Sequence, residues 1–228
     1  MADRNEEKRI AAVAAVAEIE AGMVVGLGTG TTAAFAIAAL GRRVADGLRV
    51  TAAGTSLDTE RKARAAGIAM IAFEDVGRVD LAIDGADEID PAFRAIKGGG
   101  GAMVREKIIA ASATRMICIV DAGKPVPRLA RALPIEVLPF ARAFVGLEIA
   151  RLGGDPVLRV GAGGAPVLSD QSNLLIDCAF GPIADPAALA VALDAVPGLV
   201  GHGLFLTEVD ALFVGSGDEV RRHERHAE

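Results

Sequence analysis

The chain has 228 residues, 52% of them hydrophobic, and a formal net charge of −6. This length fits one domain of ordinary size, or one domain with a smaller one attached, and the apolar share allows a substantial core. The acidic balance and the lack of a polybasic block argue against nucleic acid and against an anionic membrane surface as general partners. Any anionic ligand must therefore be held by a local site.

In the first half of the chain, short apolar segments alternate with helical patterns. The patterns predict helices at residues 6–20, 31–40, 58–66 and 102–113, and strands at residues 23–27, 48–53, 68–73, 79–83 and 116–120. Gly41 is expected to end the second helix. This alternation predicts an α/β fold, a Rossmann-like and mostly parallel sheet with helices on both faces.

After Lys124 several prolines interrupt the chain and its pattern changes. The next elements are predicted in the order strand, helix, strand, strand, helix, strand, at residues 135–138, 141–152, 157–160, 174–178, 186–195 and 199–206. This is the order of a small ferredoxin-like α+β domain. Residues 211–215 form a last strand that could rejoin the first sheet, and the charged tail 221–228 is expected to be a frayed helix or disordered.

We therefore predict a Rossmann-like domain of residues 1–130 and 207–228, and a smaller α+β domain of residues 131–206.

One uncharged segment, residues 21–41, is long enough to span a membrane, but its glycine- and threonine-rich centre favours a buried strand, turn and helix. The first residues have no apolar stretch of the signal-peptide type. Cys118 and Cys178 lack a CxxC partner, which predicts buried reduced thiols and a cytoplasmic location.

Four polar clusters each follow a predicted strand, at residues 28–32, 54–56, 84–88 and 121–124. Ligands of parallel sheets bind outside the carboxyl ends of the strands, so these clusters are expected to meet at one edge. In the first cluster, GTGTT, glycines and free helix amides suit an anion. The dinucleotide fingerprint is incomplete, so we favour a single phosphate; a capped tight turn is the alternative.

The third cluster reads DGADE at residues 84–88. Asp84 and Asp87 could face one cleft and bind substrate hydroxyls or a metal. The metal interpretation lacks histidine support and calcium-loop spacing, and helix capping by the aspartates is the remaining alternative.

Lys97 and the four glycines that follow it are the more specific signal. A glycine run has a large conformational entropy cost, and its successive amides can form a nest for an oxyanion beside the lysine charge. A flexible surface loop is the alternative. Glu106 lies at the start of the next helix, about one turn from this loop, and can reach the same ligand. No histidine lies near these motifs, so a carboxylate or a lysine would carry any proton transfer.

The order and spacing of GTGTT, DGADE, KGGG at 97–100 with REK at 105–107, and DAGK at 121–124 resemble the ribose-5-phosphate isomerase A family over essentially the whole chain. Gly101 departs from the family pattern, where relatives often have alanine. The resemblance implies that D-ribose 5-phosphate and D-ribulose 5-phosphate are interconverted through an enediol(ate) in the pentose phosphate pathway. It also implies no metal or organic cofactor, and a homodimer or a dimer of dimers to which the smaller domain contributes.

Carried over residue by residue, the resemblance implies that Glu106 is the base that shuttles a proton between C2 and C1. Lys97 and the glycine-loop amides are implied to stabilise the enediolate oxygen, and Asp84 and Asp87 to bind hydroxyls and assist opening of the furanose ring. The implied substrate contacts are Lys8, Thr29, Gly30, Thr31, Thr32, Gly85, Ala86, Gly98, Gly99, Gly100 and Lys124. On sequence grounds alone, Lys8 and Lys124 would be surface residues, and Thr55 and Ser56 a helix cap.

Two rival functions remain open. A 6-phosphosugar deaminase or lactonase on a similar fold would be expected to use a histidine, and none lies near the motifs. A non-catalytic sugar-phosphate sensor would usually carry a DNA-binding segment, and the chain has no spare basic helix-turn-helix region. Ligand binding without turnover would identify a sensor.

Overall fold

The computed structural model describes residues 3–225, which divide into two compact units. The first unit comprises the chain up to Ala86, Arg105–Pro125 and the chain from Thr207 onward; the second comprises Asp87–Val104 and Val126–Leu206. The sequence-based division placed residues 87–104 in the larger domain. They pack with the second unit, because the short strands β5 (Glu88–Ile89) and β6 (Ala95–Ile96) form a sheet with β12 (Leu204–Phe205).

The first unit contains a seven-stranded sheet in the order β14-β13-β7-β4-β1-β2-β3, in which every neighbouring pair is parallel except β13 and β14. This confirms the mostly parallel, Rossmann-like prediction and the return of the last apolar strand to the first sheet. The strands are β1 Val24–Leu27, β2 Thr51–Gly54, β3 Ala69–Met70, β4 Val79–Asp84, β7 Ala113–Asp121, β13 Ala211–Ser216 and β14 Glu219–Glu224.

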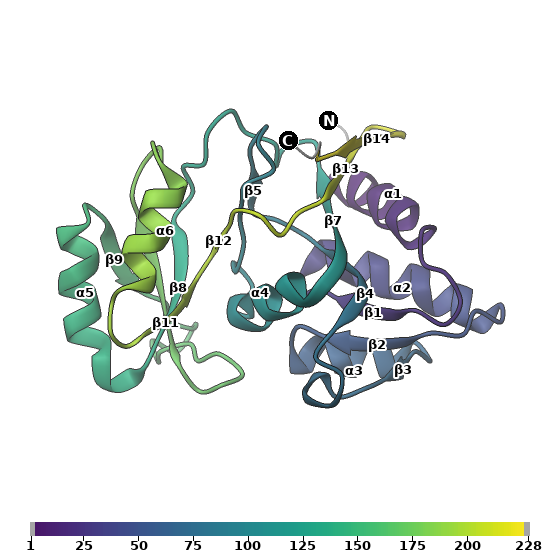
Figure 1. The fold of residues 1–228 in the computed structure, drawn as a ribbon, viewed down its shortest axis with the longest axis horizontal. Coiled ribbons are helices and arrows are strands. Elements are labelled where there is room, and N and C mark those ends of the chain that lie inside the picture. The colour runs from purple at the N-terminus through teal and green to yellow at the C-terminus, as the bar shows by residue number, and fades with distance from the viewer. Residues whose placement is uncertain (1–2, 226–228) are drawn as a thin grey trace. The chain divides into compact units, whose positions relative to one another are not determined.

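Helices cover both faces of this sheet, as predicted (Figure 1). One core cluster joins α1 (Arg4–Val16), α2 (Thr31–Ala45) and α3 (Leu57–Ala65) to side chains of the sheet such as Leu27 and Ile83. Side chains alternate along a strand, so Gly26 faces the opposite side. There it contacts Ile109 of α4 (Met103–Ser112) so closely that a Cβ at position 26 would lie 2.5 Å from the Ile109 Cγ2 atom.

The prediction that Gly41 ends α2 is wrong, because the helix continues to Ala45. A Cβ at position 41 would lie 2.8 Å from both Cβ and O of Ala66. The glycine therefore allows α2 to pack closely on the residue that caps α3. The predicted strand at residues 68–73 is also shorter than expected, because β3 is followed by a 3-10 turn, Phe73–Asp75.

The prediction for the charged tail is wrong over its described part. Residues 221–224 belong to β14, which pairs antiparallel with β13, and the Arg222 guanidinium lies 4.9 Å from the Phe213 ring centroid. Charged side chains are a common feature of edge strands, where they discourage pairing with other chains. Residues 226–228 lie outside the described residues.

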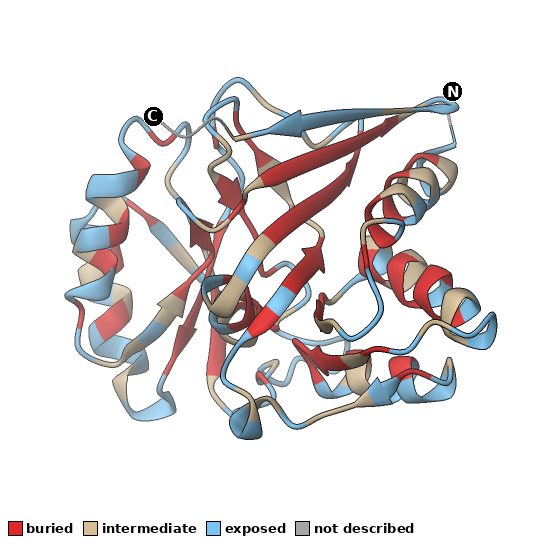
Figure 2. Cartoon of the chain, turned by 45° about the vertical axis from the view of Figure 1, so that its right-hand side comes forward, coloured by how far each residue is buried: buried red, intermediate tan, exposed pale blue. Residues whose placement is uncertain are grey.

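The second unit contains an antiparallel four-stranded sheet in the order β11-β8-β10-β9, which confirms the ferredoxin-like prediction. Its elements run β8 Leu133–Val137, 3-10 turn Pro139–Ala141, α5 Arg142–Arg151, β9 Asp155–Leu158, β10 Leu174–Ala179, α6 Pro186–Asp194 and β11 Leu199–His202. The predicted strand at 199–206 is split at Gly203 into β11 and β12, which belong to different sheets. Figure 2 shows buried residues concentrated in the strands and on one side of each long helix.

The register of the parallel sheet brings the four polar clusters to one edge, as predicted. Leu27 at the end of β1 pairs with Gly54 of β2 and with Ile83 of β4, while Asp84 pairs with Cys118 of β7. The clusters that follow these strands therefore share the carboxyl edge, where ligands of parallel sheets bind.

Candidate active site

The start of α2 has the features of a phosphate site. Gly30, the N-cap residue, has φ of +104°, and no side chain caps the helix. The first amides of a helix lack partners within the helix and attract anions. Lys8 of α1 joins this group, because its Nζ donates to the Thr31 hydroxyl at 3.2 Å. The structure thus brings together Lys8 and Thr31, residues 23 apart in sequence.

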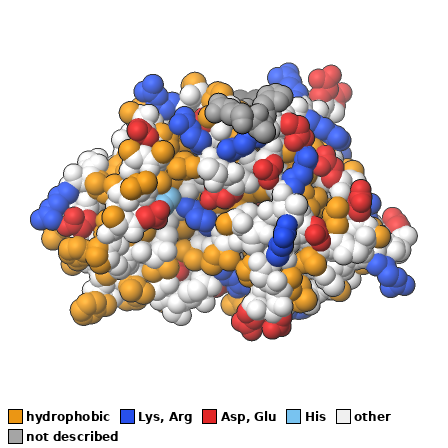
Figure 3. Space-filling model, viewed as in Figure 1, with side chains coloured by type: hydrophobic (Ala, Val, Ile, Leu, Met, Phe, Trp, Pro, Cys, Tyr) orange, Lys and Arg blue, Asp and Glu red, His pale blue; other side chains and the backbone are white. Residues whose placement is uncertain are grey.

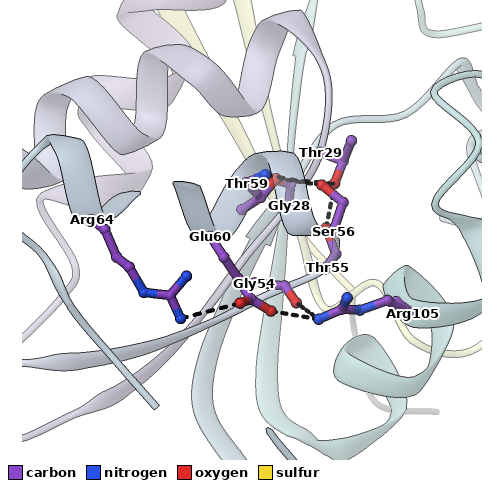
Figure 4. A network of polar contacts seen from close by, with 9 residues as sticks. All are labelled: Gly28, Thr29, Gly54, Thr55, Ser56, Thr59, Glu60, Arg64 and Arg105. Carbon is purple, nitrogen blue, oxygen red and sulfur yellow. Dashed lines mark hydrogen bonds and ion pairs between the residues drawn. The ribbon is translucent and has the colours of Figure 1, made fainter. Parts of the chain in front are cut away.

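The Thr29 side chain is engaged by three other hydroxyls (Figure 4). Its Oγ1 lies 2.7 Å from Thr55 Oγ1, 2.8 Å from Ser56 Oγ and 3.0 Å from Thr59 Oγ1, while the Thr59 hydroxyl donates to the Gly28 carbonyl at 2.8 Å. Ser56 caps α3, as the sequence suggested. A substrate contact of Thr29 stays a prediction. The network gives its hydroxyl a further role, which is to fix the GTGTT turn against α3.

Asp84 occupies the last position of β4 and is only 4% exposed. Its Oδ1 accepts a hydrogen bond from the Gly85 amide at 2.7 Å. The carboxylate packs directly on Gly28, where an added Cβ would lie 1.9 Å from that oxygen. Gly85 also lies beside the start of α2, since a Cβ there would be 3.5 Å from Thr32 Cβ. The first and third motifs therefore meet, and Gly28 leaves the space that the Asp84 carboxylate occupies.

Glu106 lies in the first turn of α4 and is 4% exposed. Its neighbour Arg105 anchors this turn, because Nη2 of Arg105 contacts Glu60 Oε1 at 2.6 Å and the Gly54 carbonyl at 3.1 Å (Figure 4). The other Glu60 oxygen contacts Arg64 at 3.2 Å. Arg105 therefore ties the start of α4 to the end of β2. Sequence reasoning assigned Arg105 no role, and its place in the REK motif was the available signal.

Lys97 and the glycine loop belong to the second unit. Lys97 is 2% exposed, its amide donates to the Gly203 carbonyl at 2.9 Å, and its Nζ lies 5.3 Å from the Phe205 ring centroid. An ammonium over an aromatic face is held by the ring quadrupole. The loop closes as a turn in which the Gly101 amide donates to the Gly98 carbonyl at 3.0 Å. Lys97 and the loop are thus fixed by specific contacts.

Asp87 holds the glycine loop in the same unit. Its Oδ2 accepts from the Gly99 amide at 2.8 Å, and its own amide donates to the Ile96 carbonyl at 2.8 Å. Asp84 and Asp87 therefore have different protein partners, although they are three residues apart. The Gly99 amide, predicted as an oxyanion donor, is used here by Asp87. The amides of Gly98 and Gly100 have no acceptor among the described residues.

Lys124 is half-buried in the turn after β7, where its amide donates to the Asp121 carbonyl at 3.1 Å. The buried Asp121 carboxylate accepts from the Gly123 amide at 3.0 Å, so the acid shapes the turn that presents Lys124. Ala86 is half-buried after β4.

Across residues 3–225, His, Cys, Asp and Glu side chains form no group of three or more able to hold a metal ion. None of the described helices is long and apolar enough to cross a membrane.

The model of the family described as ribose 5-phosphate isomerase A (phosphoriboisomerase A) matches residues 51–219. The ribose-5-phosphate isomerase A of Sphingopyxis alaskensis is 48% identical over 223 residues, which cover 97% of each chain. The chain belongs to the ribose-5-phosphate isomerase A family. The family resemblance inferred from the motifs is thus confirmed. The ribose-5-phosphate isomerase A of Methanosarcina acetivorans is 45% identical over 96% of each chain.

Solved structures of the isomerase family share the whole fold. A D-ribose-5-phosphate isomerase in complex with phospho-erythronic acid superposes with a TM-score of 0.94 at 36% identity, over 98% of this chain and 100% of that one. The ribose 5-phosphate isomerase of Plasmodium falciparum gives a TM-score of 0.93 at 31% identity, over the same shares. The likeness therefore includes both units of this chain.

Proposed function

We propose that this chain is an aldose–ketose isomerase that interconverts D-ribose 5-phosphate and D-ribulose 5-phosphate in the pentose phosphate pathway. The observation that carries the proposal is the buried Glu106 carboxylate, held in the first turn of α4 by the Arg105 anchor, in a chain of this family. A base that moves a proton between adjacent carbons needs a fixed position, and burial together with the Arg105 anchor provides one.

In the proposed mechanism, Glu106 removes the proton from C2 of the open-chain aldose. The electron pair of the C2–H bond forms the C1–C2 double bond, and the C1 carbonyl oxygen becomes the enediolate oxygen. The proton of the C2 hydroxyl then passes to the C1 oxygen, and as the C2 oxygen forms the ketone carbonyl, the electron pair of the C1–C2 double bond takes the proton back from Glu106 at C1. Between the two proton transfers the negative charge lies on an enediolate oxygen, and preorganised donors there lower the barrier.

We assign the stabilisation of that oxygen to Lys97 and to the loop of Gly98, Gly99 and Gly100. The buried ammonium supplies the charge, and the Gly98 and Gly100 amides are the donors that no described residue uses. Asp84 and Asp87 bind hydroxyls and assist ring opening. The Asp87 contact with the loop supports a second role for it, as the residue that holds the Gly99 peptide.

The phosphate is assigned to the start of α2, with Lys8, Lys124 and the backbone of Thr29, Gly30, Thr31 and Thr32; Gly85 and Ala86 line the same substrate. Uncapped amides and the nearby Lys8 ammonium support this assignment. The relative solved with phospho-erythronic acid supports a sugar-phosphate substrate, because that ligand also combines a phosphate with an oxyanion.

We further propose that the reaction needs no metal or organic cofactor, that the enzyme is cytoplasmic, and that nucleic acid and membranes are not partners. A homodimer or a dimer of dimers is proposed, with the smaller α+β domain contributing. Exposed apolar side chains of this unit, Phe140, Phe144, Leu147 and Val191, support such a contact. Hydrophobic side chains gather on the same part of the molecule, at the left of Figure 3.

The test is turnover of ribose 5-phosphate by the purified protein in EDTA, with Glu106→Gln beside it. Loss of the base should lower kcat by roughly 10²–10⁴-fold. Glu148→Gln is the matched control, because it makes the same chemical change on α5, where Glu148 pairs with Arg151 at the surface. Near-normal turnover in Glu106→Gln would remove Glu106 from the mechanism. A folded wild type that binds the sugar phosphate without turnover would instead indicate a sensor.

A further inference from the structure

Arg159, just beyond β9, reaches the glycine loop although it lies about sixty residues from it in the sequence. Its Nη1 donates to the carbonyls of Gly98 and Gly99 at 3.3 and 3.2 Å. Its Nε donates to Asp177 Oδ2 at 2.9 Å, and its Nη2 pairs with the other Asp177 oxygen. The Arg159 side chain is 18% exposed. The guanidinium is therefore fixed by a bidentate ion pair on one side and contacts the loop with its remaining edge.

These contacts determine where the loop amides point. The C=O and N–H of a trans peptide unit point in opposite directions, and the described chain has no cis peptide bond. The peptide between Gly98 and Gly99 is held at both edges, with its carbonyl toward Arg159 and its N–H on Asp87. The next peptide has its carbonyl toward Arg159 as well, so the Gly100 N–H is directed away from the guanidinium. No described residue accepts from it.

The charge of Arg159 also acts on the donor strength of these amides. A cation at the carbonyl oxygen polarises the whole peptide unit, and hydrogen-bonded groups in a chain strengthen one another. The Gly99 carbonyl, which Arg159 contacts, belongs to the same peptide unit as the Gly100 N–H. The contact therefore makes the Gly100 N–H a better donor to an anionic oxygen. A lysine could supply the charge but lacks the planar fork that bridges a carboxylate and two carbonyls.

We propose that Arg159 is a positioning residue that orients and polarises the glycine-loop amides for an anionic substrate oxygen, with Asp177 holding its guanidinium. The inference rests on the proposed function, in which this loop stabilises the enediolate. Arg159 acts only through the loop peptides. Its loss should therefore weaken binding of the transition state more than binding of the substrate.

The experiment compares Arg159→Met, Arg159→Lys and Asp177→Asn with wild type in steady-state isomerisation of ribose 5-phosphate. Arg159→Met should lower kcat by about 10–10²-fold, less than the loss of a direct oxyanion donor, while KM changes by less than about threefold. Arg159→Lys should recover only part of the loss, and Asp177→Asn should cause a smaller one. Arg151→Gln is the matched control, since it removes an arginine ion pair of the same unit from an exposed helix.

The affinity of the variants for phospho-erythronic acid is the second readout. Across the variants, the affinity for phospho-erythronic acid should fall in proportion to kcat/KM if the loop amides bind an anionic oxygen. A purely structural role of Arg159 would not produce this correlation. Unchanged kcat in folded Arg159→Met, or a loss of thermal stability with a pure KM effect, would overturn the inference. If Arg159→Met does not fold, Arg159→Lys and Asp177→Asn decide on the same criteria. An inactive wild type in the same assay would instead refute the proposed function, and the inference with it.

Discussion

Replacing Gly28 by alanine tests whether the Asp84 carboxylate occupies the place that the structure gives it. The substitution removes no functional group and adds one methyl. That methyl would lie 1.9 Å from Asp84 Oδ1 and 2.1 Å from its Cγ. Ordinary contact distances between such atoms are about 3.5 Å, so the carboxylate must move by about 1.5 Å or the GTGTT turn must shift.

Both consequences can be given a size. Overpacking of a buried position costs about 1–3 kcal/mol of unfolding free energy. A displacement of about 1 Å in a group that contacts the substrate lowers the rate about 10²-fold. We expect Gly28→Ala to lose about two orders of magnitude in kcat/KM, with a lower midpoint of thermal unfolding.

The assay is isomerisation of ribose 5-phosphate together with thermal unfolding of the same preparations. Gly146→Ala makes the same change in α5, where an added Cβ meets no atom within 4 Å. It should be neutral or stabilise by up to about 1 kcal/mol, as expected for alanine in place of a helical glycine. A Gly28→Ala protein with wild-type kcat/KM and unfolding midpoint would show that Asp84 does not pack on residue 28, and the reasoning would fail.

Three further outcomes are expected. Gly101→Ala should lower the unfolding free energy by about 1–2 kcal/mol in denaturant titrations, because φ is +83° there and a side chain is strained in that region; an unchanged midpoint would contradict this backbone conformation. Burial raises the pKa of the Cys178 thiol from 9.0 to about 12, so iodoacetamide at pH 8 should label it only after unfolding. Because the unfolded thiol ionises first, stability should fall as the pH rises from about 9 toward 12, less so in Cys178→Ala. Glu136→Ala should cost about 2–4 kcal/mol, since its fully buried carboxylate accepts 2.7 Å hydrogen bonds from Ser169 and Asn173; a loss below about 0.5 kcal/mol would show that these contacts contribute little.

The features that sequence predicted well are those with a short-range cause. Alternation of apolar strands with helices predicted the parallel sheet, and the position of polar clusters after strands predicted their common edge. Tertiary packing overrode local signals elsewhere. Gly41 is a helix breaker by propensity, yet it lies inside α2. Ala66 at the end of α3 packs where a side chain at position 41 would be, so close packing of the two helices favours glycine there. The charged tail resembled a frayed end, yet β13 offered an edge on which it pairs as β14.

Within the candidate site, the motif residues were found from sequence, whereas the residues that hold them were not. Arg105 and Glu60 are 45 residues apart, and Arg159 lies about 60 residues from the loop that it contacts. Neither pair has a sequence spacing that predicts contact. Only the fold brings them together, and a single sequence carries no covariation to reveal such pairs.

The structure also changes the argument for the glycine loop. A run of four glycines suggested an oxyanion nest because such a run has little value for packing. Yet Gly98 has φ of +101° and Gly101 φ of +83°, and a Cβ on Gly99 would lie 2.8 Å from the Asp87 carboxylate. At these three positions the turn itself therefore favours glycine, whatever it binds. The case for an oxyanion role depends instead on the direction of the Gly100 amide, on the buried Lys97 that precedes the loop, and on Arg159, which contacts the loop carbonyls.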